Sequence, residues 1–150
     1  MGTVHEIYIA HQGSEPMEQV LEAEAVANGG LRGDRYCERV GYYTGLDECQ
    51  LTLIQSEDLE EIQQTTGIHV LNGEHRRNIV TRDLQLAEMS TGTFRIGEAI
   101  LAFDRPRPPC AYIQSITERG MTQALMGKAG ICAVVVEGGL IRRGDTITLL

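Results

Sequence analysis

Short strand-like segments separated by glycine dominate this sequence and constrain its fold more than any other feature. Two of them, GTFRIGEAI (92–100) and GLIRRGDTI (139–147), share the pattern G-x-x-R-x-G-[DE]-x-I. Each predicts two short strands joined by a turn of glycine and an acidic residue. A duplication could explain the echo, but shared turn chemistry explains it more simply. Further strands are predicted from β-branched, aromatic and aliphatic residues at 3–10, 50–54, 77–81 and 130–139.

Fewer segments predict helices. Ser56 is a suitable N-cap and Gly67 a suitable end for one helix, and residues 119–130 predict a second. The stretch VLEAEAVA (20–27) fits either a helix or a strand, and we take it as a strand. We therefore expect a mostly β fold, a largely antiparallel β-barrel with a few helical insertions, in which residues 1–150 form one domain.

The charge distribution is uneven along the chain. The net charge of −8 argues against general nucleic-acid binding. Residues 1–31 and 40–75 contain twelve acidic residues and no Lys or Arg, so all thirteen basic residues lie elsewhere, and twelve of them are Arg. Arginine binds phosphate and carboxylate bidentately. The pattern fits ordinary surface charge, or a convergence of arginines on an anionic ligand.

Neither the N-terminal segment nor the composition suggests export. The first thirteen residues lack a basic segment followed by a long apolar run, and no stretch approaches the ~18 apolar residues of a membrane span. We expect a cytoplasmic protein without a membrane partner. An even cysteine count could mean two disulfides, but no CxxC motif occurs and the four histidines show no ligand spacing, so we expect no zinc site.

The stretch RPRPPCAYI (105–113) is the most constrained in the chain. Its three prolines remove backbone donors, which excludes the middle of a sheet. Cys110 then begins a predicted helix, CAYIQSIT, close to Arg105 and Arg107. A helix start and positive charge both lower a thiol pKa, and the thiolate is the nucleophile and metal ligand. The alternative is a buried structural cysteine.

The other cysteines have weaker contexts. Cys132 lies in the apolar run GICAVVV and is expected in the core. Cys37 follows a glycine-rich loop and could approach the pocket of Cys110. Cys49 directly precedes a predicted strand, and we expect no reactive role for it.

Two basic motifs could hold an anion. In GGLRGDRY (29–36) the glycines allow close approach of a ligand to the backbone, and Asp34 and Arg35 could pair or hold the loop. In EHRRNIVT (74–81), a strand would place Arg76 and Asn78 on one face and Arg77 on the other, so one arginine could face a pocket while the other is solvated. A plain turn and an exposed basic strand end are the structural alternatives.

Taken in order, several motifs resemble the MOSC domain, the molybdenum cofactor sulfurase C-terminal domain. They are GLRGDRY, LTLI, EHRRNIV, L-x-x-M-x-x-G-x-F-R-I-G-E-A, PPC and MGKAGICAVVVEGGLIRRGDTITLL, and the resemblance covers about residues 20–149. It implies a MOSC-type β-barrel with Cys110 at the characteristic cysteine position of the family. Members of the family occur fused to a pyridoxal-phosphate-dependent desulfurase, in molybdenum cofactor reductases, and as stand-alone domains.

The resemblance also implies a ligand set. Cys110 would be the catalytic residue and, if the metal binds, the molybdenum ligand. The phosphate-bearing pterin of the molybdenum cofactor would be held by Arg32, Asp34, Arg35, Arg76, Arg77 and Asn78. Tyr36 stands where a histidine is common in the family. The sequence shows no desulfurase motif, so pyridoxal phosphate is expected only on a partner desulfurase.

Three functions follow as hypotheses. In the first, Cys110 accepts sulfane sulfur or ligates molybdenum, with a cysteine desulfurase or a molybdoenzyme as partner. In the second, the protein is a small molybdoenzyme that reduces N-hydroxylated compounds. In the third, it is a non-catalytic module whose acidic segments dock a partner. Whether the chain is an enzyme stays open at this point.

Overall fold

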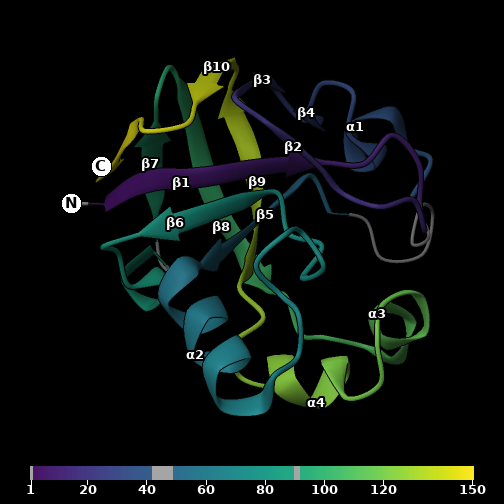
Figure 1. Ribbon diagram of the computed structural model, residues 1–150. Helices are drawn as coiled ribbons and strands as arrows, with labels where there is room; N and C mark the ends of the chain where they lie inside the picture. The colour runs from purple at the N-terminus through teal and green to yellow at the C-terminus, as the bar shows by residue number, and fades with distance from the viewer. Residues whose placement is uncertain (1, 42–48, 90–91) are drawn as a thin grey trace.

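The computed structural model describes residues 2–41, 49–89 and 92–150 (Figure 1). The strands are β1 (Gly2–Ile9), β2 (Glu18–Val20), β3 (Glu22–Val26), β4 (Gly30–Leu31), β5 (Leu51–Gln55), β6 (Ile79–Arg82), β7 (Thr93–Ile96), β8 (Ala99–Pro106), β9 (Ile131–Glu137), β10 (Gly139–Arg142) and β11 (Thr146–Leu149). The helices are α1 (Arg35–Glu38), α2 (Ser56–Thr66), α3 (Ala111–Ile116) and α4 (Met121–Leu125), with a 3-10 turn at Leu86–Met89.

Seven of the described strands close into a barrel. Their order is β11-β7-β8-β9-β5-β6-β1, and β1 pairs with β11 through Gly2 and Ile147 to complete the ring. All pairs are antiparallel except β5 with β6, which α2 connects as a crossover. β2 extends β1, and β10, β3 and β4 form a smaller second sheet. The predicted mostly β barrel with a few short helices is confirmed, as a mixed rather than a purely antiparallel one.

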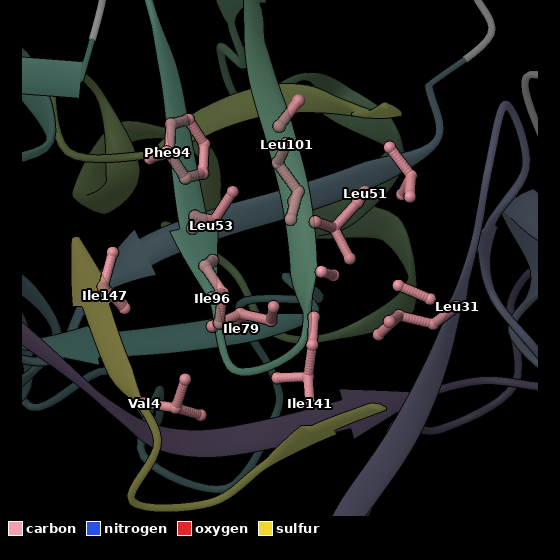
Figure 2. Close-up of a cluster of buried hydrophobic side chains, with 14 of the residues drawn as sticks. Val4, Leu31, Leu51, Leu53, Ile79, Phe94, Ile96, Leu101, Ile141 and Ile147 are labelled. Carbon is pink, nitrogen blue, oxygen red and sulfur yellow. The ribbon is translucent and has the colours of Figure 1, made fainter. Parts of the chain in front are cut away.

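The barrel interior is filled by alternating apolar side chains. On β7 the inward residues Phe94 and Ile96 alternate with exposed neighbours, as the two-residue period of a strand requires. Figure 2 shows side chains from strands far apart in sequence meeting here, among them Val4, Leu53 and Ile147. This interior fixes which face of each strand points outward.

A second apolar cluster lies outside the barrel, under α2, α3 and α4, which lie together in Figure 1. Ile54 and Val80 supply the strand side of this cluster, and Ile113 and Met121 anchor α3 and α4 to it. The anchoring matters for the site, because α3 directly follows Cys110. No helix in the described ranges is long and apolar enough to cross a membrane.

Most predicted elements are present, with local corrections. Residues 20–27 contain a strand, β3, and both G-x-x-R-x-G-[DE]-x-I stretches contain two strands joined by a turn. The predicted N-cap at Ser56 is wrong: Gln55 is the N-cap, because β5 runs straight into α2. Gly67 ends that helix in the left-handed conformation, as predicted. The helix predicted over 119–130 is only α4, since Gly120 at φ 93° precedes its first turn.

Candidate functional site

Cys110 shares a cavity of about 150 Å³ with four arginines. We call it the Cys110 cavity. The polar and charged side chains around the thiol are Arg35, Arg76, Arg77, Arg107, Tyr36 and Tyr112. These residues come from α1, from the segment before β6, and from the β8–α3 connection with the start of α3. The fold therefore gathers three chain segments that are far apart in sequence.

Cys110 lies where the proline-rich connection turns into a helix. Its backbone is extended, at φ −139° and ψ 172°, and it is the N-cap of α3, as predicted. The carbonyl oxygen of Cys110 accepts a hydrogen bond from Thr122 Oγ1 at 2.8 Å, which ties the residue to α4. The residue is half-buried, so the thiol is held at the cavity rather than enclosed in the core.

Arg107 reaches the cavity, whereas Arg105 does not line it. The backbone N–H of Arg107 donates to the Gly130 carbonyl at 3.0 Å, next to β9. Arg105 lies opposite Cys132 on β9 and forms an ion pair with Asp104. Of the two arginines predicted to flank the thiol, only Arg107 is thus a neighbour in the same cavity.

Arg77 is buried and held by backbone carbonyls. Its Nε donates to the Ala129 carbonyl at 2.7 Å, and its Nη2 donates to the Arg107 carbonyl at 3.3 Å. Burial lowers the pKa of Arg77, with a smaller contribution from the charge of Arg107. A lowered guanidinium pKa means that the buried cation costs free energy, which a bound anion would offset.

Arg76 lies before β6 rather than in a strand. Its φ of 63° is left-handed, which is uncommon for a residue with a Cβ. Its Nη1 donates to the Glu15 carbonyl at 2.5 Å, while its buried Nη2 has no hydrogen-bond partner among the described residues. Burial lowers the pKa of Arg76 as well. The predicted alternation, with Arg76 and Arg77 on opposite faces and one of them solvated, is wrong because β6 begins only at Ile79.

Asp34 orients Arg35 instead of facing the cavity. The fully buried carboxylate accepts from Ala10 N at 3.0 Å, from Arg35 Nη1 at 3.0 Å and from Tyr36 N at 3.3 Å, capping α1. Arg35 Nη2 donates to the Tyr36 hydroxyl and to the Arg76 carbonyl, both at 3.1 Å. Both outcomes foreseen for Asp34 and Arg35, mutual pairing and a held loop, therefore occur together.

Two candidate residues lie elsewhere. The side chain of Arg32 is largely exposed and donates through Nε and Nη2 to Glu24. Asn78 is buried, and its side chain joins Thr52 of β5 to Tyr8 of β1. The structure therefore brings Arg35, Arg76 and Arg77 to Cys110 but leaves Arg32 and Asn78 outside the lining of this cavity.

Tyr112 is a cavity residue that sequence reasoning missed. Its hydroxyl shares a hydrogen bond of 2.7 Å with Ser14 Oγ, from the loop after β1. Tyr112 lies two residues after Cys110, and this proximity is the signal in the sequence that could have pointed to it. Its contact with Ser14 has no sequence signal, because residues 14 and 112 meet only in the folded chain. For Arg107 the sequence predicts only a positive charge near the thiol, whereas the structure places it in the cavity lining.

The remaining cysteines form a separate group. Cys37 and Cys49 line a neighbouring cavity that, among the described residues, has only Tyr36 in common with the Cys110 cavity. Cys132 is fully buried, as predicted. The pKa of Cys49 is raised because its thiol is hydrogen-bonded with Cys132 and because it is buried; burial also raises the pKa of Cys37. The described thiols are all free.

The arrangement suits an anion beside a soft nucleophile. Four arginines line one cavity with the thiol, and the carboxylate of Asp34 already accepts from Arg35. Such a cavity can hold a phosphate or carboxylate by charge-assisted hydrogen bonds. Positive charge also favours the thiolate form of a cysteine, which is the form that attacks sulfur or binds a soft metal.

Comparisons with known proteins agree on the fold. Over its whole length the chain is similar to the solved structure of the YuaD protein from Bacillus subtilis, with a TM-score of 0.79, 20% identity, and coverage of 99% of this chain and 96% of that one. The YiiM structure from Geobacillus stearothermophilus gives a TM-score of 0.77 at 15% identity, covering 100% and 75%. The YiiM structure from Escherichia coli gives a TM-score of 0.72 at 20% identity, with coverage of 100% of this chain and 70% of that one.

No curated protein matches the sequence. The profile of the MOSC domain matches residues 40–148, which is most of the chain and includes Cys110, Arg76 and Arg77. The match agrees with the motif order in the sequence and with the seven-stranded barrel. The chain therefore belongs to the MOSC domain family.

Proposed function

We propose that this protein works with the molybdenum cofactor, and that Cys110 accepts sulfane sulfur or ligates molybdenum. The observation that carries the proposal is the placement of the Cys110 thiol in one cavity with Arg35, Arg76, Arg77 and Arg107. Cysteine thiolate is a soft ligand that suits both sulfur and molybdenum.

The residues present fit a phosphate-bearing cofactor. Arg76 Nη2 is a buried donor without a partner in the described parts of the chain, and an acceptor oxygen on a ligand would satisfy it. Arg35 is already oriented by Asp34, so its charge is positioned before a ligand arrives. When bound, the cofactor would supply a redox-active metal at the thiol. The chain itself would supply the anion clamp and the thiolate.

The sulfur step needs no further reagent than a donor persulfide. The Cys110 thiolate attacks the terminal sulfur of R–S–SH, a new S–S bond forms at Cys110, and the donor S–S bond breaks. The donor leaves as R–S⁻, and the terminal sulfur keeps its proton. Arg107 and its neighbours favour this reaction by stabilising the attacking thiolate, and the half-buried position of Cys110 leaves a path for the donor.

Mass spectrometry tests the carrier role directly. The protein is incubated with a cysteine desulfurase and cysteine, and each cysteine-containing peptide is analysed. We expect the mass of one added sulfur atom on Cys110 and none in Cys110→Ser. Equal labelling of buried Cys132, or no addition at Cys110, would contradict the proposal.

Elemental analysis separates sulfur transfer from metal ligation. The wild-type protein and Cys110→Ser are produced in a host that makes the cofactor. If the wild-type protein contains molybdenum in proportion to protein and Cys110→Ser contains none, the thiol ligates the metal. Sulfur uptake without molybdenum indicates the carrier role.

A further inference from the structure

A second cavity of about 500 Å³ adjoins the Cys110 cavity. We call it the Glu74 cavity. Its lining includes Ser14, Met17, Glu74, Arg76, Ile116 and Met121. The Cys110 cavity, at about 150 Å³, is smaller than the roughly 300–1,000 Å³ of ordinary ligand pockets, whereas the Glu74 cavity falls within that range. A phosphate-bearing heterocycle that reaches Cys110 therefore needs room outside the Cys110 cavity.

Arg76 and a Tyr112–Ser14 hydrogen bond link the two cavities. Arg76 lines both of them, and its Nη1 is fixed on the Glu15 carbonyl while Nη2 is left without a partner in the described structure. Tyr112 lines the Cys110 cavity and Ser14 lines the Glu74 cavity, and their hydroxyls share one hydrogen bond of 2.7 Å. An anionic group at Arg76 would thus lie between a thiol on one side and a roomy cavity on the other.

The Glu74 cavity combines two carboxylates with apolar side chains. The second carboxylate, Glu118, already accepts the backbone N–H of His69 at 2.7 Å and lies 3.1 Å from His69 Nδ1. Glu74 is half-buried, and its Oε1 accepts a hydrogen bond from Asn72 N at 2.8 Å. A carboxylate accepts about four hydrogen bonds, so it keeps capacity for a ligand. Within the described chain Glu74 and Arg76 form no ion pair with each other, although they lie two residues apart and line one cavity.

Three apolar residues of the wall suit a flat ring. Met17 and Met121 come from segments far apart in sequence, and Ile116 ends α3. Methionine sulfur makes favourable contacts with aromatic rings, and the unbranched side chain adapts to their shape. The complementary ligand has an anionic group for Arg76, a flat body, and an N–H edge for a carboxylate.

We propose that the Glu74 cavity binds a 2-aminopyrimidin-4-one ring, with the Glu74 carboxylate accepting its ring N–H and 2-amino groups. This pairing uses two parallel hydrogen bonds to one carboxylate, the same geometry in which a carboxylate meets arginine. The inference rests on the proposed function, because it takes the ligand at Cys110 to be a phosphate-bearing pterin, which contains this ring.

Fluorescence anisotropy of 6-hydroxymethylpterin tests the assignment. The chain has no Trp, so the signal of the pterin is observed against a low protein background. We expect saturable binding that is about tenfold weaker in Glu74→Gln, as loss of a charge-assisted hydrogen-bonded pair predicts. The matched control Glu88→Gln, on an exposed residue, leaves affinity unchanged.

A second probe and a second variant sharpen the result. The lumazine analogue, in which oxygen replaces the 2-amino group, is expected to bind about tenfold more weakly to the wild type and to be insensitive to Glu74→Gln. Ile116→Trp, which fills the cavity, should weaken pterin binding as well. Guanine carries the same hydrogen-bonding edge. If guanosine 5′-monophosphate competes with the pterin, the cavity recognises the shared ring; if it does not compete, the cavity recognises the pterin as a whole.

Two outcomes overturn the inference: no saturable pterin binding by the wild type, or equal affinity in the wild type and a folded Glu74→Gln. Sulfur uptake by wild-type Cys110 is measured on the same preparation without pterin. Protein that takes up sulfur but binds no pterin rejects this inference alone. Protein that binds pterin through Glu74 but takes up neither sulfur nor molybdenum rejects the proposed function alone.

Discussion

At the scale of single residues, His75 organises the arginine-bearing segment. It is fully buried, and its Nδ1 accepts the backbone N–H of Arg77 at 2.9 Å, so the ring proton lies on Nε2. Nε2 has no hydrogen-bond partner in the described chain, and the ring meets Tyr8 edge-on at 5.3 Å. Burial, and then the charges of Arg77 and Arg76, lower the pKa of His75 to about 3.

This gives a defined pH dependence of stability. His75 stays neutral in the folded protein but gains a proton below pH 6.5 when unfolded, so its contribution is complete above pH 6.5 and is lost as the pH falls toward 3. Between pH 7 and pH 5 we expect the free energy of unfolding to fall by about 2 kcal/mol. Urea denaturation at both pH values measures the difference. In His75→Gln the fall should be much smaller, and an identical fall in both proteins would contradict the assignment.

Residue types near Cys110 could be anticipated from the sequence, but their geometry could not. RPRPPC indicates a fixed thiol beside positive charge, and the structure places Arg107 there. Arg76 has a left-handed backbone because it lies in a turn, in which its N–H donates to the Gly73 carbonyl. The two-residue alternation of a strand therefore cannot predict where its side chain points. Tyr112 and Ser14 meet only through tertiary structure.

At the scale of elements, the residue before β9 holds the backbone of Arg107, which lines the Cys110 cavity. Gly130 has φ 87° and precedes β9, and a Cβ at this position would overlap the carbonyl oxygen of Leu53 on β5. The Gly130 carbonyl also accepts the N–H of Arg107. Close approach of β9 to β5 and the placement of Arg107 therefore depend on the same residue.

Substitution of Gly130 should be costly for that reason. We expect Gly130→Ala to lower the free energy of unfolding by roughly 3 kcal/mol or more, because a backbone oxygen cannot move aside as a side chain can. Gly127→Ala is the matched control: Gly127 also has positive φ, at 78°, but no atom of the described residues lies within 4 Å of its added Cβ. It should cost only about 1 kcal/mol. Equal losses in denaturant titrations of the two variants would contradict this explanation.

Strands were the easiest elements to predict, because their two-residue alternation and glycine turns are local signals. β3, β5, β7 and β9 all fall where these signals occur. The N-cap of α2 was misplaced, since a strand leading directly into a helix shifts the boundary by one residue. The parallel pairing of β5 with β6 follows from α2 between them, because a strand–helix–strand crossover is what lets two neighbouring strands run in the same direction.

At the scale of the whole molecule, closure of the barrel creates the site. β8, β9, β5 and β6 are neighbours in the sheet, and the segments next to β6 and β8 meet α1, so that residues near positions 35, 76 and 110 line one cavity. In the sequence the arginines occur only as separate motifs. Which of them line the cavity is decided by the tertiary structure. Arg35, Arg76 and Arg77 reach the cavity, while Arg32 pairs with Glu24 on the surface and Asn78 joins two strands.

The central claim is that Cys110 faces a positively charged cavity, and alkylation with two matched reagents tests it. Iodoacetate is anionic and iodoacetamide neutral, and the ratio of their rates at Cys110 is compared with that of a free small thiol by peptide mass spectrometry. Arginines that gather iodoacetate should raise the ratio by about tenfold at low salt, and added salt or Arg76→Gln should reduce it. A ratio equal to that of the free thiol, unchanged in Arg76→Gln, would contradict the claim.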